Sequence, residues 1–151
     1  MKRMKYSFIK IIALCLVLSM VAPVVANGAI VEPALPMASL YIDEYSSTIS
    51  SMGFGRVRID FDIWGTGIMD EIGARSIEVY ESSDNVNWTY KQTYSCESYL
   101  SMMAEDATHC IYNVSYQGVP GRYYKAYICF WSGKNGGGDN RYMWTNVKRA
   151  T

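Results

Sequence analysis

The stretch "GVPGRYYKAYICFWSGKNGGGDNRYMW" (residues 118–144) has the most regular pattern in the chain and decides its fold class. After the turn formers Pro120 and Gly121, apolar side chains occupy alternate positions from Tyr124 to Phe130, which predicts a strand with one buried face. The glycine-rich "SGKNGGGDN" then predicts a hairpin turn, with "RYMWTNVK" as the returning strand. Residues 118–144 are therefore expected to form two antiparallel strands and the turn between them.

The same alternation recurs upstream, most clearly in "RVRIDFDIW" (residues 56–64). Its apolar side chains fall on one face and its charged side chains on the other, which is typical of an antiparallel sheet with one buried and one solvent-exposed face. The remaining strands are expected at residues 39–49, 75–81, 88–94 and 110–116. Only residues 66–74 and 98–107 could hold a helical turn, and neither segment has the length or the caps of a helix.

Seven short strands separated by turn signals predict an all-β chain with one immunoglobulin-like β-sandwich over residues 40–149. A small barrel is the alternative. Tyr124 begins a strand four residues after Pro120, and this placement resembles the tyrosine corner of fibronectin type III domains. The turn-rich "SSDNVNW" (residues 82–88) is similar to the C–C′ turn of that family. The resemblance implies that the Tyr124 hydroxyl bonds back to the loop before its strand.

The first 26 residues have the pattern of a signal peptide. Lys2, Arg3, Lys5 and Lys10 precede an apolar run at residues 11–22, which is shorter than a membrane span requires. Cleavage is expected after Ala26, and residues 27–39 are expected to be a linker. The protein is therefore expected to be secreted, with no transmembrane segment once the signal is removed.

Cleavage changes the charge of the chain. The full sequence has 14 basic and 14 acidic residues. Removing the four basic residues of the signal leaves 10 basic against 14 acidic residues, a net charge of −4. No Lys/Arg cluster remains in the sequence, which argues against a nucleic-acid partner and against an anionic membrane surface.

The order of motifs also resembles a family of small secreted proteins from Gram-positive bacteria of the gut Firmicutes type. The shared segments are Met69–Ala74, Ser115–Gly118, Tyr123–Tyr127 and Gly133–Tyr142. The resemblance implies an exported domain and carries no activity with it.

The sequence offers no convergent set of catalytic or metal-binding residues. His109 is the single histidine. Its neighbour Cys110 points to the opposite face of a strand, so the two cannot form a catalytic dyad. Asp60 and Asp62 share a face with Arg58 and are interpreted as a solvated charge stripe. We therefore predict a protein that is not an enzyme, without a metal site or cofactor.

Three cysteines follow the expected cleavage point: Cys96, Cys110 and Cys129. Export permits disulfide formation, and the short loop between the first two predicts a Cys96–Cys110 bond. Cys129 is then the unpaired thiol, and Cys110–Cys129 is the alternative pairing.

The chain is unusually rich in aromatic residues, with 13 tyrosines and four tryptophans. Alternation places Tyr80, Tyr127 and Trp131 on the outer face of two strands that are expected to share a sheet. These three are the predicted ligand-binding residues, since aromatic side chains with polar tips suit sugar rings and protein partners. The alternative is that they only pack across strands.

The functional hypothesis is a secreted, non-catalytic module that binds an extracellular glycan, cell-wall polymer or protein. A small secreted effector or bacteriocin-like antagonist is the alternative, because size and export fit it equally well.

Overall fold

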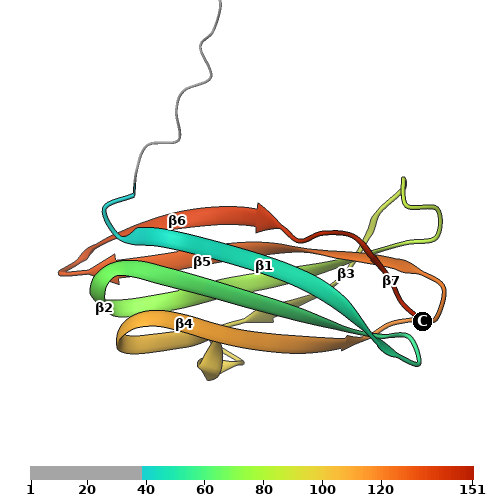
Figure 1. The fold of residues 1–151 in the computed structure, drawn as a ribbon, viewed down its shortest axis with the longest axis horizontal. Coiled ribbons are helices and arrows are strands. Elements are labelled where there is room, and N and C mark those ends of the chain that lie inside the picture. Colours follow the sequence, from blue (N-terminus) through green and yellow to red (C-terminus); the bar gives the residue numbers. More distant parts are fainter. Residues whose placement is uncertain (1–38) are drawn as a thin grey trace, which may run out of the picture. The chain divides into compact units, whose positions relative to one another are not determined.

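The computed structural model describes residues 39–151. The expected signal peptide and residues 27–38 of the expected linker lie outside this range. The described chain folds into a single antiparallel sheet, which confirms the all-β prediction (Figure 1). Its strands are β1 (Ile42–Gly53), β2 (Arg56–Ser82), β3 (Thr89–Ser95), β4 (Met103–Gln117), β5 (Tyr123–Lys134), β6 (Gly137–Trp144) and β7 (Lys148–Arg149), and a 3₁₀ helix, η1 (Leu100–Met102), precedes β4. No helix within residues 39–151 is long and apolar enough to cross a membrane.

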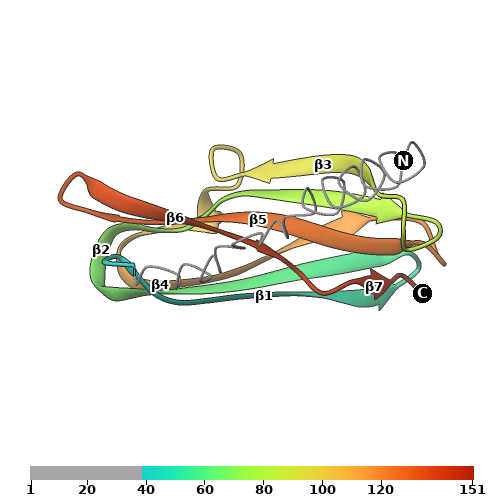
Figure 2. The same ribbon diagram turned by 90° about the horizontal axis from the view of Figure 1, so that it is seen from above.

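Strand β2 organises the sheet because it takes part in both of its halves. Its first half pairs with β1 and β4, and its second half pairs with β3 and β5. Strand β5 then pairs with β6 and β7. The two halves lie over one another as two layers (Figure 2).

The segment at residues 66–74, which the sequence left open for a helical turn, is the middle of β2. Glu71, Ile72 and Gly73 pair with β4 on one side and with β5 on the other. Extended backbone satisfies partners on both sides at once, whereas a helix would leave both neighbouring strands without them. The predicted strands at 56–64 and 75–81 are therefore parts of one 27-residue strand.

The core lies between the two layers and follows the predicted alternation. The Phe130 ring of β5 lies 6.0 Å from Phe61 of β2 and 5.3 Å from Tyr45 of β1, measured between ring centroids. The fully buried residues around them include the alternating positions of β2 and β5: Val57, Ile59, Ile63, Ile77, Val79, Tyr124, Ala126 and Ile128.

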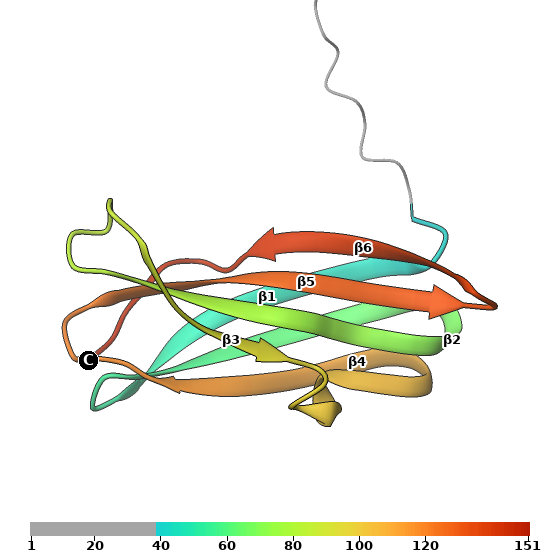
Figure 3. The same cartoon turned by 180° about the vertical axis from the view of Figure 1, so that it is seen from behind.

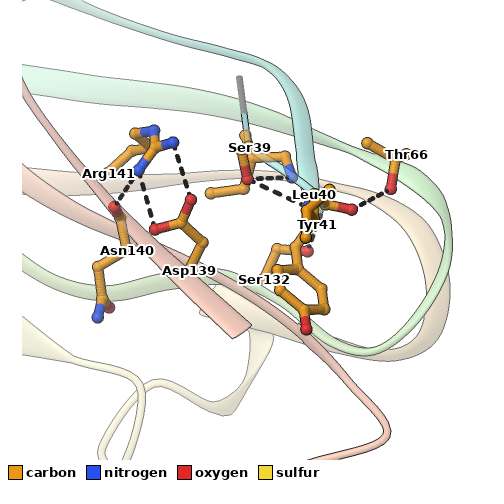
Figure 4. Close-up of polar contacts among 9 residues, drawn as sticks. Ser39, Leu40, Tyr41, Thr66, Ser132, Asp139, Asn140 and Arg141 are labelled. Carbon is orange, nitrogen blue, oxygen red and sulfur yellow. Dashed lines mark hydrogen bonds and ion pairs between the residues drawn. The ribbon is translucent and has the colours of Figure 1, made fainter. Parts of the chain in front are cut away.

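Side-chain hydrogen bonds fasten the first described residues to the sheet (Figure 4). The Ser39 hydroxyl accepts from the backbone N–H groups of Tyr41 and Ile42. Thr66, in β2, donates to the Leu40 carbonyl at 2.8 Å, and Ser132, in β5, donates to the Tyr41 carbonyl at 2.9 Å. The start of β1 is thus tied to both layers.

The loop between β4 and β5 contains the contact that the fibronectin resemblance implied. The Val119 backbone N–H donates to the Tyr124 hydroxyl at 2.8 Å. That hydroxyl in turn donates to the Glu81 carboxylate of β2. Tyr124 therefore joins the entry of β5 to the neighbouring strand while its ring fills the core.

Candidate functional site

The outer surface of one half of the sheet carries a connected group of aromatic side chains, three of which are exposed. The second half of β2, β3, β5 and β6 lie side by side there (Figure 3). We call this surface the aromatic face; its members are Tyr80, Trp88, Tyr90, Lys125, Tyr127, Tyr142 and Trp144.

The β5–β6 hairpin sets the centre of the aromatic face. Its pairing places Trp144 directly opposite Tyr127, and their ring centroids lie 4.7 Å apart. Tyr142 stacks on Tyr127 at 5.8 Å with an interplanar angle of 15°. Cross-strand neighbours on one face of a sheet come this close because their Cβ atoms are separated by about 5 Å.

Strands β2 and β3 extend the face from the other side of β5. Tyr80 meets Trp144 edge-on at 5.2 Å and Tyr90 at 5.9 Å. The Tyr80 hydroxyl donates to the Glu78 carboxylate at 2.7 Å. This hydrogen bond is the main cause that raises the pKa of Tyr80, because the phenol must keep its proton in order to donate.

A cation lies within the aromatic face. The Lys125 ammonium group is 4.3 Å from the ring centroid of Trp144 and 4.4 Å from that of Trp88. Each indole attracts the ammonium through its negative face. Lys125 is thereby positioned so that an acceptor oxygen of a ligand could bind between the rings.

The aromatic face is accessible to solvent. Tyr142 is 56% exposed, Tyr90 is 53% exposed and Trp144 is 45% exposed. Tyr80, Trp88 and Tyr127 are half-buried beneath or beside them. Exposed ring surface is therefore available, and a ligand could contact several rings at once.

Of the three predicted ligand-binding residues, Tyr80 and Tyr127 both contact Trp144. The third, Trp131, lies apart from them. Its indole N–H donates to the Glu71 carboxylate at 3.2 Å. The Arg75 guanidinium stacks over its ring at 3.7 Å. Within the described residues, Trp131 is half-buried and contacts no ring of the aromatic face, so we interpret it as a packing residue.

The predicted Cys96–Cys110 disulfide is not formed: within residues 39–151 the structure has three free cysteines. Cys110 is buried, and its thiol donates to the Met102 carbonyl at 3.6 Å. Burial raises the pKa of this thiol to about 11, with the Asp62 carboxylate adding to the effect. Cys129 lies on the outer face, as predicted, and is half-buried.

The other polar residues considered from the sequence lie on the opposite half of the sheet. Asp60 forms an ion pair with Arg58 at 3.0 Å. His109 stacks on Trp64 with ring centroids 4.5 Å apart. Within the described part of the chain, His, Cys, Asp and Glu form no group of three that could hold a metal ion.

The sequence reading missed Trp88, Tyr90, Lys125, Tyr142 and Trp144. A usable signal for the last two was the Asn135-Gly136 pair, which is the strongest short hairpin signal. Placing the turn at that pair and counting outward puts Trp144 opposite Tyr127, as observed.

Comparisons of the chain with protein-family models, with curated proteins and with solved structures found no match.

Proposed function

We propose that this protein is a non-catalytic binding module that uses the aromatic face to hold an extracellular glycan, cell-wall polymer or protein. The observation that carries the proposal is the continuous contact of Tyr80, Trp144, Tyr127 and Tyr142 across three strands. Folding does not require large apolar rings on a solvent-facing surface, and aromatic residues with polar tips are the usual anchors of binding sites.

A glycan is the ligand class that the chemistry of the face favours. Sugar rings present flat C–H surfaces that stack on Trp and Tyr, and their hydroxyl or carboxylate oxygens can accept from the Lys125 ammonium group. The Tyr90 hydroxyl is already bonded to Thr93 at 3.0 Å and the Tyr142 hydroxyl to the Cys129 thiol. Each phenol oxygen can still accept one further hydrogen bond from a sugar hydroxyl at the rim.

The test is retention of the purified protein on peptidoglycan, mucin and a panel of insoluble polysaccharides. Trp144→Ala is expected to abolish retention on the matrix that binds the wild-type protein. Trp64→Ala is the matched control, because Trp64 is 40% exposed, close to the 45% of Trp144, and lies on the opposite half of the sheet. Equal retention of both variants would refute the assignment of the face.

A second variant tests whether Trp131, which the sequence predicted as a ligand-binding residue, contributes to binding. Trp131→Ala is expected to leave retention nearly unchanged, since its ring is engaged by Arg75 and Glu71.

A third variant tests the role of the cation. Lys125→Met keeps the length of the side chain and removes the charge, so it is expected to weaken binding of acidic polysaccharides more than neutral ones.

We also propose that the fold is an immunoglobulin-like sandwich of the fibronectin type III kind, exported by the N-terminal signal and related to small secreted proteins of gut Firmicutes-type bacteria. Support for the sandwich comes from the grouping of strands, with β1, β2 and β4 on one side and β3, β2, β5 and β6 on the other. The hydrogen bond from Val119 to Tyr124 adds to it. N-terminal sequencing of protein from culture medium tests the export, with a first residue of Asn27 expected.

A further inference from the structure

The turn between β1 and β2 presents Phe54, whose side chain is 94% exposed. Gly53 pairs with Arg56, so Phe54 and Gly55 are the central residues of a two-residue hairpin turn. Their φ angles are 54° and 79°, and a type I′ turn requires positive values at both positions. Asn or Gly suits the first position, whereas a bulky side chain there is sterically strained.

The β5–β6 hairpin provides an internal comparison. Lys134 pairs with Gly137 around Asn135 and Gly136, whose φ angles of 53° and 78° nearly repeat those of the first turn. Here the chain uses the residues that the geometry favours. Phe54 therefore occupies a position where Asn would fold more easily and where almost none of its surface is buried. Strain at such a position indicates a role outside folding.

Neighbouring segments hold this turn in place. The Gln117 side-chain amide donates to the Phe54 carbonyl at 3.0 Å. Gly55 accepts from the Gly118 N–H and donates to the Thr151 carbonyl. The β1–β2 hairpin, the β4–β5 loop and the C-terminal segment accordingly lie at the same end of the domain (Figure 1). Val119, in that loop, is 52% exposed and adds apolar surface.

Three segments at this end of the domain carry exposed cations: Arg56, Arg122, Lys148 and Arg149. Arg56 directly follows the turn. Backbone hydrogen bonds join Arg122 to Val119 and to the C-terminal segment, and β7, which carries the last two, pairs with the start of β5. Within residues 39–151, none of the four forms an ion pair. The Arg149 guanidinium donates to the Gly121 carbonyl at 3.0 Å and lies 5.7 Å from the ring centroid of Tyr123.

Local contacts hold the acidic side chains at the end of β2 and in the β2–β3 loop. Asp84 accepts hydrogen bonds from Ser82, Val86 and Asn87 within the β2–β3 loop. Glu81 pairs with Lys91 and accepts from the Tyr124 hydroxyl. The sequence shows no run of basic residues, so it argued against an anionic surface; folding assembles the cations from distant positions.

We propose that Phe54 and these four cations form a docking site for an anionic phospholipid bilayer. The Phe54 ring enters the boundary between headgroups and acyl chains, and the cations contact lipid phosphates around it. A bilayer fits better than a protein, because the apolar part is one projecting side chain on a fixed turn, with cations on the segments at the same end of the domain. The site is separate from the aromatic face and does not depend on the function proposed for that face.

The experiment is co-sedimentation of the purified protein, produced from the full chain, with two kinds of vesicle. One contains phosphatidylcholine alone, and the other is an equimolar mixture of phosphatidylcholine and phosphatidylglycerol. The wild-type protein is expected to sediment with the mixed vesicles and to be released by salt. Phe54→Asn is expected to weaken binding roughly tenfold or more, which corresponds to the burial of one Phe side chain. The double variant Arg122→Gln/Lys148→Gln is expected to weaken it by roughly fivefold for each charge removed.

A stability measurement makes the test specific. Phe54→Asn is expected to unfold at the same temperature as the wild-type protein or higher, because it relieves the strained turn, so lost binding cannot come from misfolding. Leu100→Asn is the control; Leu100 is 77% exposed in η1, which lies away from the turn. Equal binding by wild type and Phe54→Asn, or no binding of mixed vesicles by the wild type, overturns the proposal. Capture of a protein by the wild type but not by Phe54→Asn, without vesicle binding, overturns it in favour of a protein partner.

Discussion

Removing one hydroxyl group at Tyr124 tests the contact that joins the β4–β5 loop to the two layers. The Tyr124 ring is fully buried, and Tyr124→Phe keeps that ring and its packing. The variant loses the hydrogen bond from Val119 at 2.8 Å and the one to the Glu81 carboxylate. A neutral hydrogen bond contributes about 1 kcal/mol and one to a charged group about 1.5–3 kcal/mol.

We expect a loss of about 2 kcal/mol, below the sum of the two bonds. Glu81 keeps Lys91 as a partner at 3.5 Å, and the N–H of the half-exposed Val119 can bond to water. For a domain of this size, a loss of about 2 kcal/mol corresponds to a fall in Tm of roughly 8 °C. Urea unfolding followed by circular dichroism measures the free energy directly, and the m-value should stay constant.

The matched control is Tyr116→Phe. The Tyr116 ring lies 5.7 Å from that of Tyr124, yet within the described residues its hydroxyl has no hydrogen-bond partner. A change below about 0.5 kcal/mol is expected for this variant, as for most substitutions without a lost contact. If Tyr124→Phe behaved like Tyr116→Phe, the hydroxyl contacts would contribute nothing and the reasoning would fail.

Alkaline pH provides an independent check on the same group. Burial, with the Glu81 hydrogen bond next, raises the pKa of Tyr124 to about 12. The folded protein therefore holds this proton more tightly than the unfolded chain, where the pKa is about 10. The stabilisation is intact below pH 10 and is lost as the pH rises toward 12. Tyr94, whose pKa burial also raises to about 12, remains in Tyr124→Phe, so the variant should lose less stability over this window than the wild type.

Three further substitutions or measurements test the fold. Phe130→Ala, at the contact between the layers, is expected to cost about 3–5 kcal/mol in urea unfolding; a cost below 1 kcal/mol would mean that the layers do not meet there. Gly136→Ala is expected to cost about 1–2 kcal/mol because φ is 78° and no other atom is crowded, whereas Gly67→Ala, in equally open space but with an ordinary φ, should cost less. Thiol titration of the denatured protein should give the same count before and after reduction, and an increase of two would reveal a disulfide; in the native state Cys110 should react slowest, since burial raises its pKa to about 11.

The period-2 alternation of apolar residues predicted which face of each strand is buried, because that property can be read from one strand alone. Alternation alone predicted that Val57, Ile59 and Phe61 lie on the buried face, and all three are buried in the structure. It could not show that β2 continues through residues 66–74, because Ile72, Gly73 and Ala74 are buried in succession. Residues 56–64 also have a paired strand on both sides and still alternate, so the run at 72–74 means that both faces of β2 are covered at this point. A short buried run of this kind does not distinguish a strand from a helical turn.

The candidate site was only half predictable for a similar reason. The outward direction of Tyr80 and Tyr127 follows from alternation alone. The place of Trp131 depends on Arg75 and Glu71, which belong to another strand, and the bulge between Ala74 and Ser76 shifts that strand's register. A one-residue shift reverses the face of a strand, so side-chain partners across it cannot be read without the pairing.

The two hairpin turns show why residues that folding does not require are the best guide to function in this chain. Asn135 and Gly136 suit their turn, and their consequence is structural: they set the register that places Trp144 beside Tyr127. Phe54 is strained in its turn because its φ is positive, and its exposed side chain gains no packing that would offset this strain. Local preference and overall fold agree throughout most of a natural protein, and departures concentrate at functional sites. By that criterion we propose the exposed rings of the aromatic face and the strained Phe54 turn as two separate binding surfaces of the sheet. A protein that attached to a membrane through the turn would still present the aromatic face, because that face lies along the strands rather than at the end that carries Phe54.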